Sequence, residues 1–293
     1  MSWLLLDVGN STLKWSLVAQ LPAPAAGSTA GFEATRPEAT YAQGALAIDA
    51  PDLTQKLAAE WSKAFASTAE DTPPRSPTAA WGCAVAAPDR IAAIAAALHL
   101  AGSPAAQWFG AEADFDFGGI VLHNGYCDPQ QLGADRWHAL IGARARFAHG
   151  ALLVVNAGTA TTVDAISADG RFLGGVIAPG VALMRASLAR GTARLPLAAG
   201  RYVAHPDNTD DAICTGVLDA QIGLIVQRLQ RIRESVDGAV QVVVSGGNGP
   251  LLLGLLRGQA GLGTMTLEPD LVLLGLWHRA HAQTTQRPAN RNQ

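Results

Sequence analysis

One short pattern occurs twice in this chain, about half its length apart, and it restricts the fold more than any other feature. The first copy, Trp3–Val18, is a buried apolar run, a loop of small polar residues and an alternating strand. The second copy, Leu152–Ile166, has the same order, and Asn156 aligns with Asp7 at an offset of 149 residues (156 − 7) in a chain of 293. The repeat predicts two related halves, each built around one β-hairpin.

The hairpin loops have the residue types that bind phosphate. Gly9 lets backbone come close to a ligand, and Asp7 adds one carboxylate at the end of the buried strand. Backbone donors with one acid suit a phosphate and its Mg²⁺, which the acid holds or orients through water. A surface hairpin with ordinary turn residues explains one copy as well, but two copies favour a clamp on a polyphosphate. In the alignment, Gly158 falls on Gly9, Thr159 on Asn10 and Thr161 on Thr12.

Composition and charge argue against several classes of protein. Hydrophobic residues make up 49% and charged residues 15%, which is typical of a globular chain. A net charge of −3 argues against a nucleic-acid binder. The apolar start carries Asp7 early and has no basic region, so we expect a core strand and no signal peptide. We expect no membrane span. Three widely spaced cysteines predict neither a disulfide framework nor a zinc site, which favours a reduced cytoplasm.

The pattern of elements predicts an α/β fold. In the first half, strands precede alternating helices and strands: a weak strand near Phe32, helix Asp52–Ser67, strand Ala79–Val85, helix Pro88–Leu100 and a short strand at Trp108–Phe109. In the second half we expect strand Phe172–Ala178, helix Val181–Leu188, helix Asp211–Ser235, strand Val240–Val244 and helix Leu271–His281. The long helix at Asp211 could join a dimer interface, although a core helix is the simpler interpretation. We divide the chain into residues 1–149, 150–282 and a flexible tail, 283–293.

A dense polar cluster precedes the helix expected over Ala134–Phe147. Asp135 and Arg136 lie in its first turn, after Gly133. An acid at this place is ordinary capping chemistry. A cation is less expected there, because the helix dipole disfavours it. The residues alone leave a capping role and a binding role open.

Glycines gather at two later points of the second half. Gly174, Gly175 and Gly180 allow backbone to approach a ligand, or mark bulges. The stretch Ser245–Gly249 follows a buried strand and opens onto a helix, which is a typical nucleotide pocket. Its spacing is not GxGxxG, so we do not expect a Rossmann site.

Five motifs in this order carry a family resemblance: DVGNST, GADR, NAGTATT, GGVIAPG and SGG. The chain resembles type III pantothenate kinases, which include Bvg accessory factors and belong to the superfamily of acetate and sugar kinases, Hsp70 and actin. The resemblance implies two related actin/ribonuclease H-like halves, each a mixed sheet flanked by helices. It also implies a homodimer, and ATP-dependent phosphorylation of pantothenate to 4′-phosphopantothenate, the first step towards coenzyme A.

The resemblance also implies roles for individual residues. Asp135 would be the catalytic base. Pantothenate would be bound by Tyr126, Gly133, Ala134, Asp135, Arg136 and Thr209. ATP would be bound by Asp7, Val8, Gly9, Asn10, Ser11, Thr12, Leu13, Lys14, Thr159, Gly246 and Gly247, with Mg²⁺ near Asp7 and the later glycines against adenosine. Many relatives carry Asp at Asn156 and use it to hold K⁺ or NH₄⁺, so we expect a weaker monovalent-cation site here.

Other functions are less consistent with the sequence. Another kinase or phosphohydrolase of the superfamily would not need GADR together with Tyr126 and Thr209. A non-enzymatic regulatory protein would not need Asp135 and both loops. The stretch Ser11–Lys14 matches the S-x-x-K of serine acylases, but their other motifs are absent, as is a Walker A pattern. The histidines show no metal spacing; His138, close to GADR, is expected in the core or in solvent.

Overall fold

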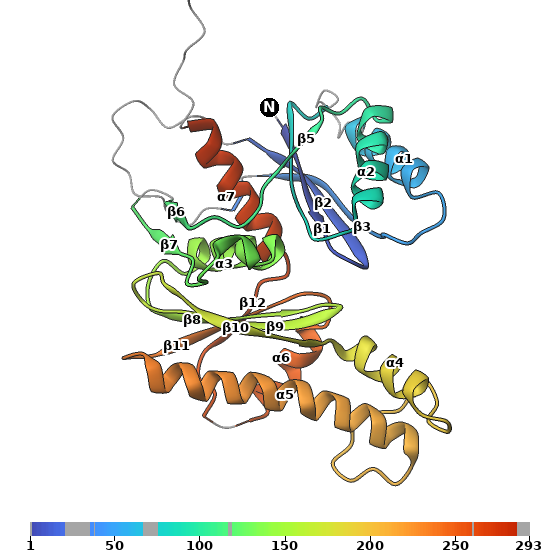
Figure 1. The fold of residues 1–293 in the computed structure, drawn as a ribbon, viewed down its shortest axis with the longest axis vertical. Helices are drawn as coiled ribbons and strands as arrows, with labels where there is room; N and C mark the ends of the chain where they lie inside the picture. Colours follow the sequence, from blue (N-terminus) through green and yellow to red (C-terminus); the bar gives the residue numbers. More distant parts are fainter. Residues whose placement is uncertain are drawn as a thin grey trace, which may run out of the picture. The chain divides into compact units, whose positions relative to one another are not determined.

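The computed structural model describes residues 2–20, 36–37, 39–66, 76–116, 119–259 and 261–285, which form two compact units (Figure 1). The first unit runs to Ala148 and takes up the chain again at Leu271, and the second is His149–Asp270. This division differs from the predicted one in one element. Helix α7 (Leu271–Thr285) was assigned to the C-terminal half, but it belongs to the first unit because it packs against α3 (Ala134–Arg146).

The first unit is built on a mixed five-stranded sheet of order β3-β2-β1-β4-β5. Three strands form an antiparallel meander, and two more continue the sheet in parallel to β1. The strands are β1 (Ser2–Val8), β2 (Thr12–Ala19), β3 (Thr40–Ala47), β4 (Ala79–Ala84) and β5 (Ala106–Trp108). Helices α1 (Leu53–Ala66) and α2 (Pro88–Leu100) pack together on one face, and a small hairpin, β6 (Asp114–Asp116) and β7 (Val121–His123), precedes α3.

The second unit repeats this topology. Its sheet has the order β10-β9-β8-β11-β12, again an antiparallel meander followed by two parallel strands. The strands are β8 (Ala151–Ala157), β9 (Ala160–Ile166), β10 (Phe172–Pro179), β11 (Val240–Ser245) and β12 (Met265–Leu267). The helices are α4 (Val181–Gly191), α5 (Thr209–Ser235) and α6 (Gly249–Arg257). The predicted fold class, an α/β chain with two mixed sheets flanked by helices, is confirmed.

Alternation along β1 explains why the sheet of the first unit needs helices on both faces. Leu4, Leu6 and Val8 point towards α1 and α2, whose buried residues include Leu57 and Trp61. The residues between them point to the other face, which α3 and α7 cover. Strand β1 is therefore buried on both sides, as its continuous apolar run predicts.

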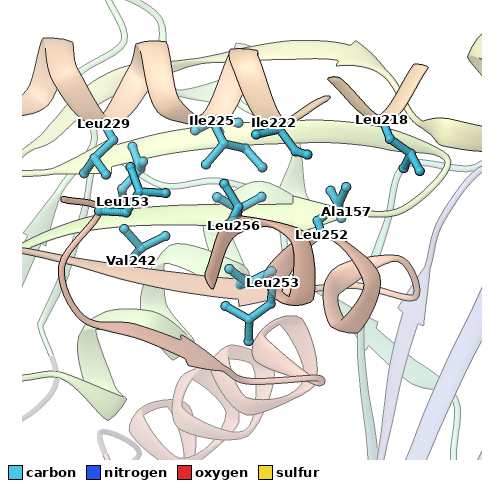
Figure 2. Packing of buried hydrophobic residues seen from close by; sticks show 14 of the residues in the cluster. Leu153, Ala157, Leu218, Ile222, Ile225, Leu229, Val242, Leu252, Leu253 and Leu256 are labelled. Atoms are coloured by element: carbon cyan, nitrogen blue, oxygen red, sulfur yellow. The ribbon is translucent and has the colours of Figure 1, made fainter. Parts of the chain in front are cut away.

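The core of the second unit lies between its sheet and two helices (Figure 2). From α5, the side chains of Leu218, Ile222, Ile225 and Leu229 point towards the sheet, where Leu153 is fully buried. Among the described residues, α5 is the one helix long and apolar enough to cross a membrane. Half of its apolar window is buried inside the protein, which is typical of a core helix.

The two hairpins differ by one residue. In the first, Val8 pairs with Leu13 and the amide of Gly9 donates to the carbonyl of Thr12. In the second, Ala157 pairs with Thr161, and the amide of Gly158 donates to the carbonyl of Ala160. Ala160 therefore takes the place of Thr12. The predicted match of Thr161 with Thr12 is wrong, because the shorter loop moves Thr161 to the buried face.

Smaller differences from the predicted elements concern strands that were not predicted and the ends of two helices. Strands β3 and β12 and the β6–β7 hairpin were not predicted, and the weak strand expected near Phe32 lies outside the described residues. Helix α5 begins two residues before its predicted start at Asp211. Helix α7 continues to Thr285, past the predicted start of the tail at residue 283.

Candidate active site

Two of the predicted acids lie together in the first unit. Asp7 on β1 pairs with Cys83 on β4 in parallel register, so both side chains point to the face that carries α3. Asp135 lies in the first turn of α3. Burial raises the pKa of the Cys83 thiol well above its usual value, and the negative charges of Asp7 and Asp135 raise that pKa further. Both carboxylates therefore lie near enough to this buried thiol to favour its neutral form.

The start of α3 fixes how Asp135 is held. The N-cap residue, Gly133, has no side chain to cap the helix, and the carboxylate Oδ1 of Asp135 accepts a hydrogen bond from the backbone amide of Arg136 at 2.8 Å. A Cβ atom on Gly133 would lie 2.7 Å from this oxygen, so a larger residue there would displace the carboxylate. The backbone at the helix N-terminus thus helps to orient the acid.

Arg136 and Tyr126 form a pair, as their motif spacing suggests. The Nη1 of Arg136 donates a 3.1 Å hydrogen bond to the Tyr126 hydroxyl, and its guanidinium lies 5.8 Å from the centre of the phenol ring. Arg136 is only 5% exposed. A buried cation with a phenol beside it suits a planar anionic group such as a carboxylate.

Asn124 holds this pair in place and was not predicted. Its side-chain oxygen accepts from the amide of Tyr126 at 3.1 Å. Its Nδ2 donates to the carbonyls of Glu112 and Pro129 at 3.1 and 3.2 Å. The Asn-Gly pair at 124–125 is a turn signal that could have indicated this role.

His138 is a core residue. Its imidazole is fully buried, and Nδ1 donates to the carbonyl of Ala134 at 2.7 Å. Burial lowers the pKa of His138 to about 4, so the ring is neutral near pH 7. His138 therefore braces the first turn of α3, in agreement with one of the two places expected for it.

Two glycines let α3 and α7 touch through their backbones. A Cβ atom on Gly142 would lie 2.2 Å from the carbonyl oxygen of Leu271, and one on Gly275 would lie 1.8 Å from that of His138. Any larger residue would push the helices apart. This crossing fixes the position of α3, and with it that of Asp135.

The first hairpin loop, residues 9–12, presents backbone and small side chains to solvent. Its amide–carbonyl bond from Gly9 to Thr12 measures 3.0 Å, and the amide of Ile48 donates to the carbonyl of Ser11 at 2.9 Å. Asn10, Ser11 and Thr12 are exposed. Of the predicted ATP-binding residues that flank the loop, Val8 and Leu13 point into the core and Lys14 is half-buried.

The second loop, residues 158–160, is supported by two glycines of the second unit. A Cβ atom on Gly180 would lie 2.3 Å from the carbonyl oxygen of Gly158. Gly246, with a φ of 87°, packs on the backbone of Ala157, where a Cβ atom would lie 2.5 Å from the carbonyl oxygen. Thr159 and Gly247 are exposed beside this support, and Asn156 is half-buried opposite Ser245. These predicted ATP-binding and cation-binding residues thus gather at one end of the sheet.

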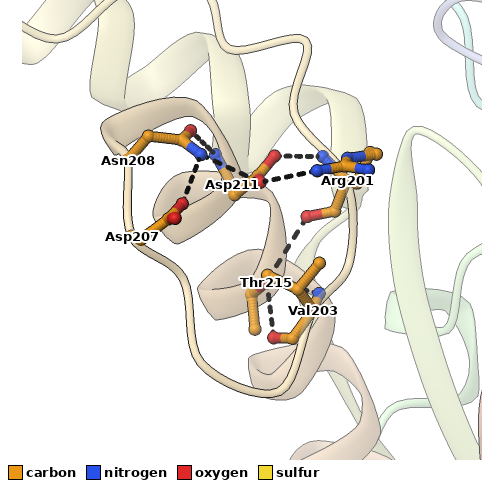
Figure 3. A network of polar contacts seen from close by, with 6 residues as sticks. All are labelled: Arg201, Val203, Asp207, Asn208, Asp211 and Thr215. Atoms are coloured by element: carbon orange, nitrogen blue, oxygen red, sulfur yellow. Dashed lines mark hydrogen bonds and ion pairs between the residues drawn. The ribbon is translucent and has the colours of Figure 1, made fainter.

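The start of α5 carries a polar network (Figure 3). Asn208 caps the helix by accepting from the amide of Asp211 at 2.9 Å. The amide of Arg201 donates to Asp211 at 2.7 Å, and this bond lowers the pKa of Asp211. Arg201 also pairs with Asp211 through its guanidinium, while Thr215 exchanges hydrogen bonds with Val203. The segment before α5 is thereby tied to the helix.

Thr209 lies at the first position of α5 and lines a pocket of about 420 Å³ between α4 and α5. The rest of the lining is largely apolar and includes Met184, Leu188 and Ile213. Thr209 is thus positioned within the second unit, whereas the predicted pantothenate-binding residues 126 and 133–136 belong to the first.

Comparison with known proteins identifies the family. A family model described as type III pantothenate kinase matches residues 3–231. The chain is 43% identical over 253 residues to the type III pantothenate kinase of Aromatoleum aromaticum, covering 86% of this chain and 89% of that one. The chain belongs to the type III pantothenate kinase family. Another type III pantothenate kinase, from Laribacter hongkongensis, is 36% identical over 277 residues, covering 94% of this chain and 98% of that one.

A solved structure shares the fold of this chain. A proposed 2-dehydro-3-deoxygalactonokinase from Sinorhizobium meliloti is similar with a TM-score of 0.56 at 16% identity, over 97% of this chain and 99% of that one. At this identity the similarity concerns the fold alone. The resemblance to type III pantothenate kinases, predicted from five short motifs, is confirmed.

Proposed function

We propose that this chain transfers the γ-phosphoryl group of ATP to the primary hydroxyl of pantothenate, giving 4′-phosphopantothenate, the first step towards coenzyme A. The observation that carries the proposal is the placement, in one unit of a type III pantothenate kinase family member, of Asp7 at the end of β1 and Asp135 in the first turn of α3. One acid serves the metal and the other serves the hydroxyl. Phosphoryl transfer needs this division of labour, because its transition state is stabilised chiefly by positioning and by charge.

The residues of the hairpin loops fit Mg²⁺·ATP. Mg²⁺ keeps several waters and is usually bound by one or two carboxylates together with substrate phosphates. Asp7, half-buried at the end of β1, supplies such a carboxylate, directly or through water. No group of three or more His, Cys, Asp or Glu side chains that could cage a metal occurs in the described part of the chain. The ion would therefore arrive with the nucleotide, whose phosphates the amides of both loops would hold.

Asp135 and the Arg136–Tyr126 pair fit the acceptor. Asp135, together with the backbone of Gly133 and Ala134, would face the reacting hydroxyl and accept its proton. The buried guanidinium of Arg136 would bind the carboxylate of pantothenate, with Tyr126 beside it. Thr209 would add a hydroxyl to the same substrate, and Gly246 and Gly247 would pack against adenosine. We further propose a homodimer in the cytoplasm, with no nucleic acid or membrane as partner.

A panel of acceptors tests the proposed function. The purified protein is incubated with Mg²⁺·ATP and, in turn, pantothenate, acetate, a hexose and polyphosphate. We expect ADP formation to depend on pantothenate. Turnover with a sugar or acetate and none with pantothenate would assign the chain to another reaction of the superfamily.

The role of Asp7 gives a prediction about ligand binding. Asp7→Asn keeps the shape of the side chain but removes the charge that attracts Mg²⁺. We expect the KM for Mg²⁺·ATP to rise by about tenfold or more, as for the loss of a charged interaction. Pantothenate affinity, measured by calorimetry, should change by less than about twofold. The opposite pattern would make Asp7 a structural residue of the turn.

Asn156 gives a prediction about monovalent cations. An amide offers one carbonyl oxygen but lacks the negative charge that offsets the dehydration of K⁺. We expect activity in Na⁺ or Tris buffer to be close to that with added K⁺ or NH₄⁺. The matched variant Asn156→Asp should gain stimulation by K⁺. Activity of the natural chain that is absent without K⁺ would show that other oxygens complete a cation site.

A further inference from the structure

One polar side chain interrupts the apolar face that α5 turns towards the sheet. Gln221 is 1% exposed, and its neighbours on this face are Leu218, Ile222 and Ile225, which all belong to the core. Burying a primary amide among apolar side chains costs free energy unless both of its polar ends find partners. Only part of this requirement is met here.

The amide nitrogen of Gln221 joins α5 to the junction between β10 and α4. Its Nε2 donates to the carbonyl of Pro179 at 2.9 Å and lies 3.0 Å from the sulfur of Met184. Its Oε1 is buried and has no hydrogen-bond partner among the described residues. The residue is therefore better suited to holding Pro179 than to stabilising the core.

Pro179 and Gly180 support the second phosphate loop directly. Pro179 pairs with Ala160 across β9 and β10. The amide of Gly180 donates to the carbonyl of Thr159 at 2.9 Å, and a Cβ on Gly180 would collide with the carbonyl of Gly158. A movement of this junction would therefore move residues 158–160.

A second incompletely bonded polar group lies on the same side of the sheet. Thr161 is 1% exposed, and its hydroxyl has no hydrogen-bond partner in the described ranges. It shares its face of β9 with Val163 and Ala165, which contribute to the core beneath α5. Two such groups beside one loop call for an explanation other than stability, since buried polar groups are normally satisfied.

We propose that Gln221 is a positioning residue for ATP: by fixing Pro179 it holds the second loop, residues 158–160, in the conformation that binds phosphate. The inference rests on the proposed function for the role of that loop. Donors already held in place bind a phosphate more tightly than donors that must be ordered on binding. Loss of Gln221 therefore weakens nucleotide binding more than it slows the transfer step.

The test compares Gln221→Leu with Ile225→Val, a core change one turn further along the same helix face. We measure the dissociation constant of a nonhydrolysable Mg²⁺·ATP analogue by calorimetry, and the KM and kcat for both substrates. In Gln221→Leu we expect the dissociation constant and the KM for ATP to rise about 3- to 10-fold, the effect of one lost hydrogen bond. The kcat and the KM for pantothenate should stay within about twofold. Ile225→Val should lower the melting temperature and leave ATP affinity unchanged.

Several results would overturn the inference. Wild-type ATP affinity in Gln221→Leu would do so. If Gln221→Leu and Ile225→Val weakened the binding of ATP and of pantothenate to the same extent, Gln221 would be an ordinary core residue. If Gln221→Leu does not fold, Gln221→Met is measured instead, and failure of both to fold would also make the residue purely structural. Should the natural chain bind the analogue without phosphorylating pantothenate, the proposed function fails, while the calorimetric comparison still decides the role of Gln221.

Discussion

Asp135→Asn is expected to lower kcat for pantothenate phosphorylation by about 10² or more, because a general base contributes about 10²–10⁴ in rate. The amide oxygen of Asn can still accept the hydrogen bond from the amide of Arg136, so α3 should start at the same residue. What the variant loses is the group that takes the proton of the hydroxyl. Steady-state kinetics should show an unchanged KM for ATP, and circular dichroism should show a folded protein.

A matched control separates the base from a helix-capping acid. Asp89 lies in the first turn of α2, as Asp135 does in α3, and its side chain is exposed. Asp89→Asn removes a similar favourable interaction with the helix dipole, and kcat should not change. Turnover of Asp135→Asn close to that of the natural chain would refute the assignment and leave Asp135 with an ordinary place at a helix N-terminus.

Gly275→Ala should have the largest effect on stability. The added Cβ would lie 1.8 Å from the carbonyl oxygen of His138 and 3.1 Å from the backbone nitrogen of Gly142. Overpacking a core costs about 1–3 kcal/mol and occasionally more, and a clash with backbone belongs at the upper end, so we expect at least about 3 kcal/mol. The measurement is denaturant unfolding of the variant beside the natural chain.

Gly254→Ala is the control for this effect. Gly254 lies inside α6, and nothing lies within 4 Å of where its Cβ would be. Alanine is the better helix former by about 1 kcal/mol, so this variant should be at least as stable as the natural chain. A Gly275→Ala protein of natural stability would show that α3 and α7 do not meet through their backbones.

The sequence predicted the two hairpins because their signal is local. An apolar run, a loop of small residues and an alternating strand can be recognised without knowing what packs on them. The sequence does not show in the same way that the second loop is one residue shorter than the first. Aligning Asn156 with Asp7 matches Gly158 to Gly9, but it gives no information on which strand residues pair.

Contacts between distant parts of the chain were beyond prediction. Gly142 and Gly275 each look like an unremarkable glycine in a helix, and only the crossing of α3 and α7 explains them. Asp7 and Asp135 were identified as candidate site residues, but Cys83, whose pKa both acids raise, was not, since it lies on a third element. The sequence does not distinguish Gln221, because a polar residue in a long helix usually faces solvent, whereas Gln221 is buried.

The most direct test of the central claim is to identify and count the product. The protein is incubated with Mg²⁺·ATP and pantothenate, and mass spectrometry with phosphorus NMR measures ADP and phosphorylated pantothenate over time. We predict one phosphopantothenate for each ADP, with the phosphate on the primary hydroxyl, and neither product in appreciable amount with Asp135→Asn. ADP released at the same rate without pantothenate, or pantothenate recovered unmodified, would contradict the account.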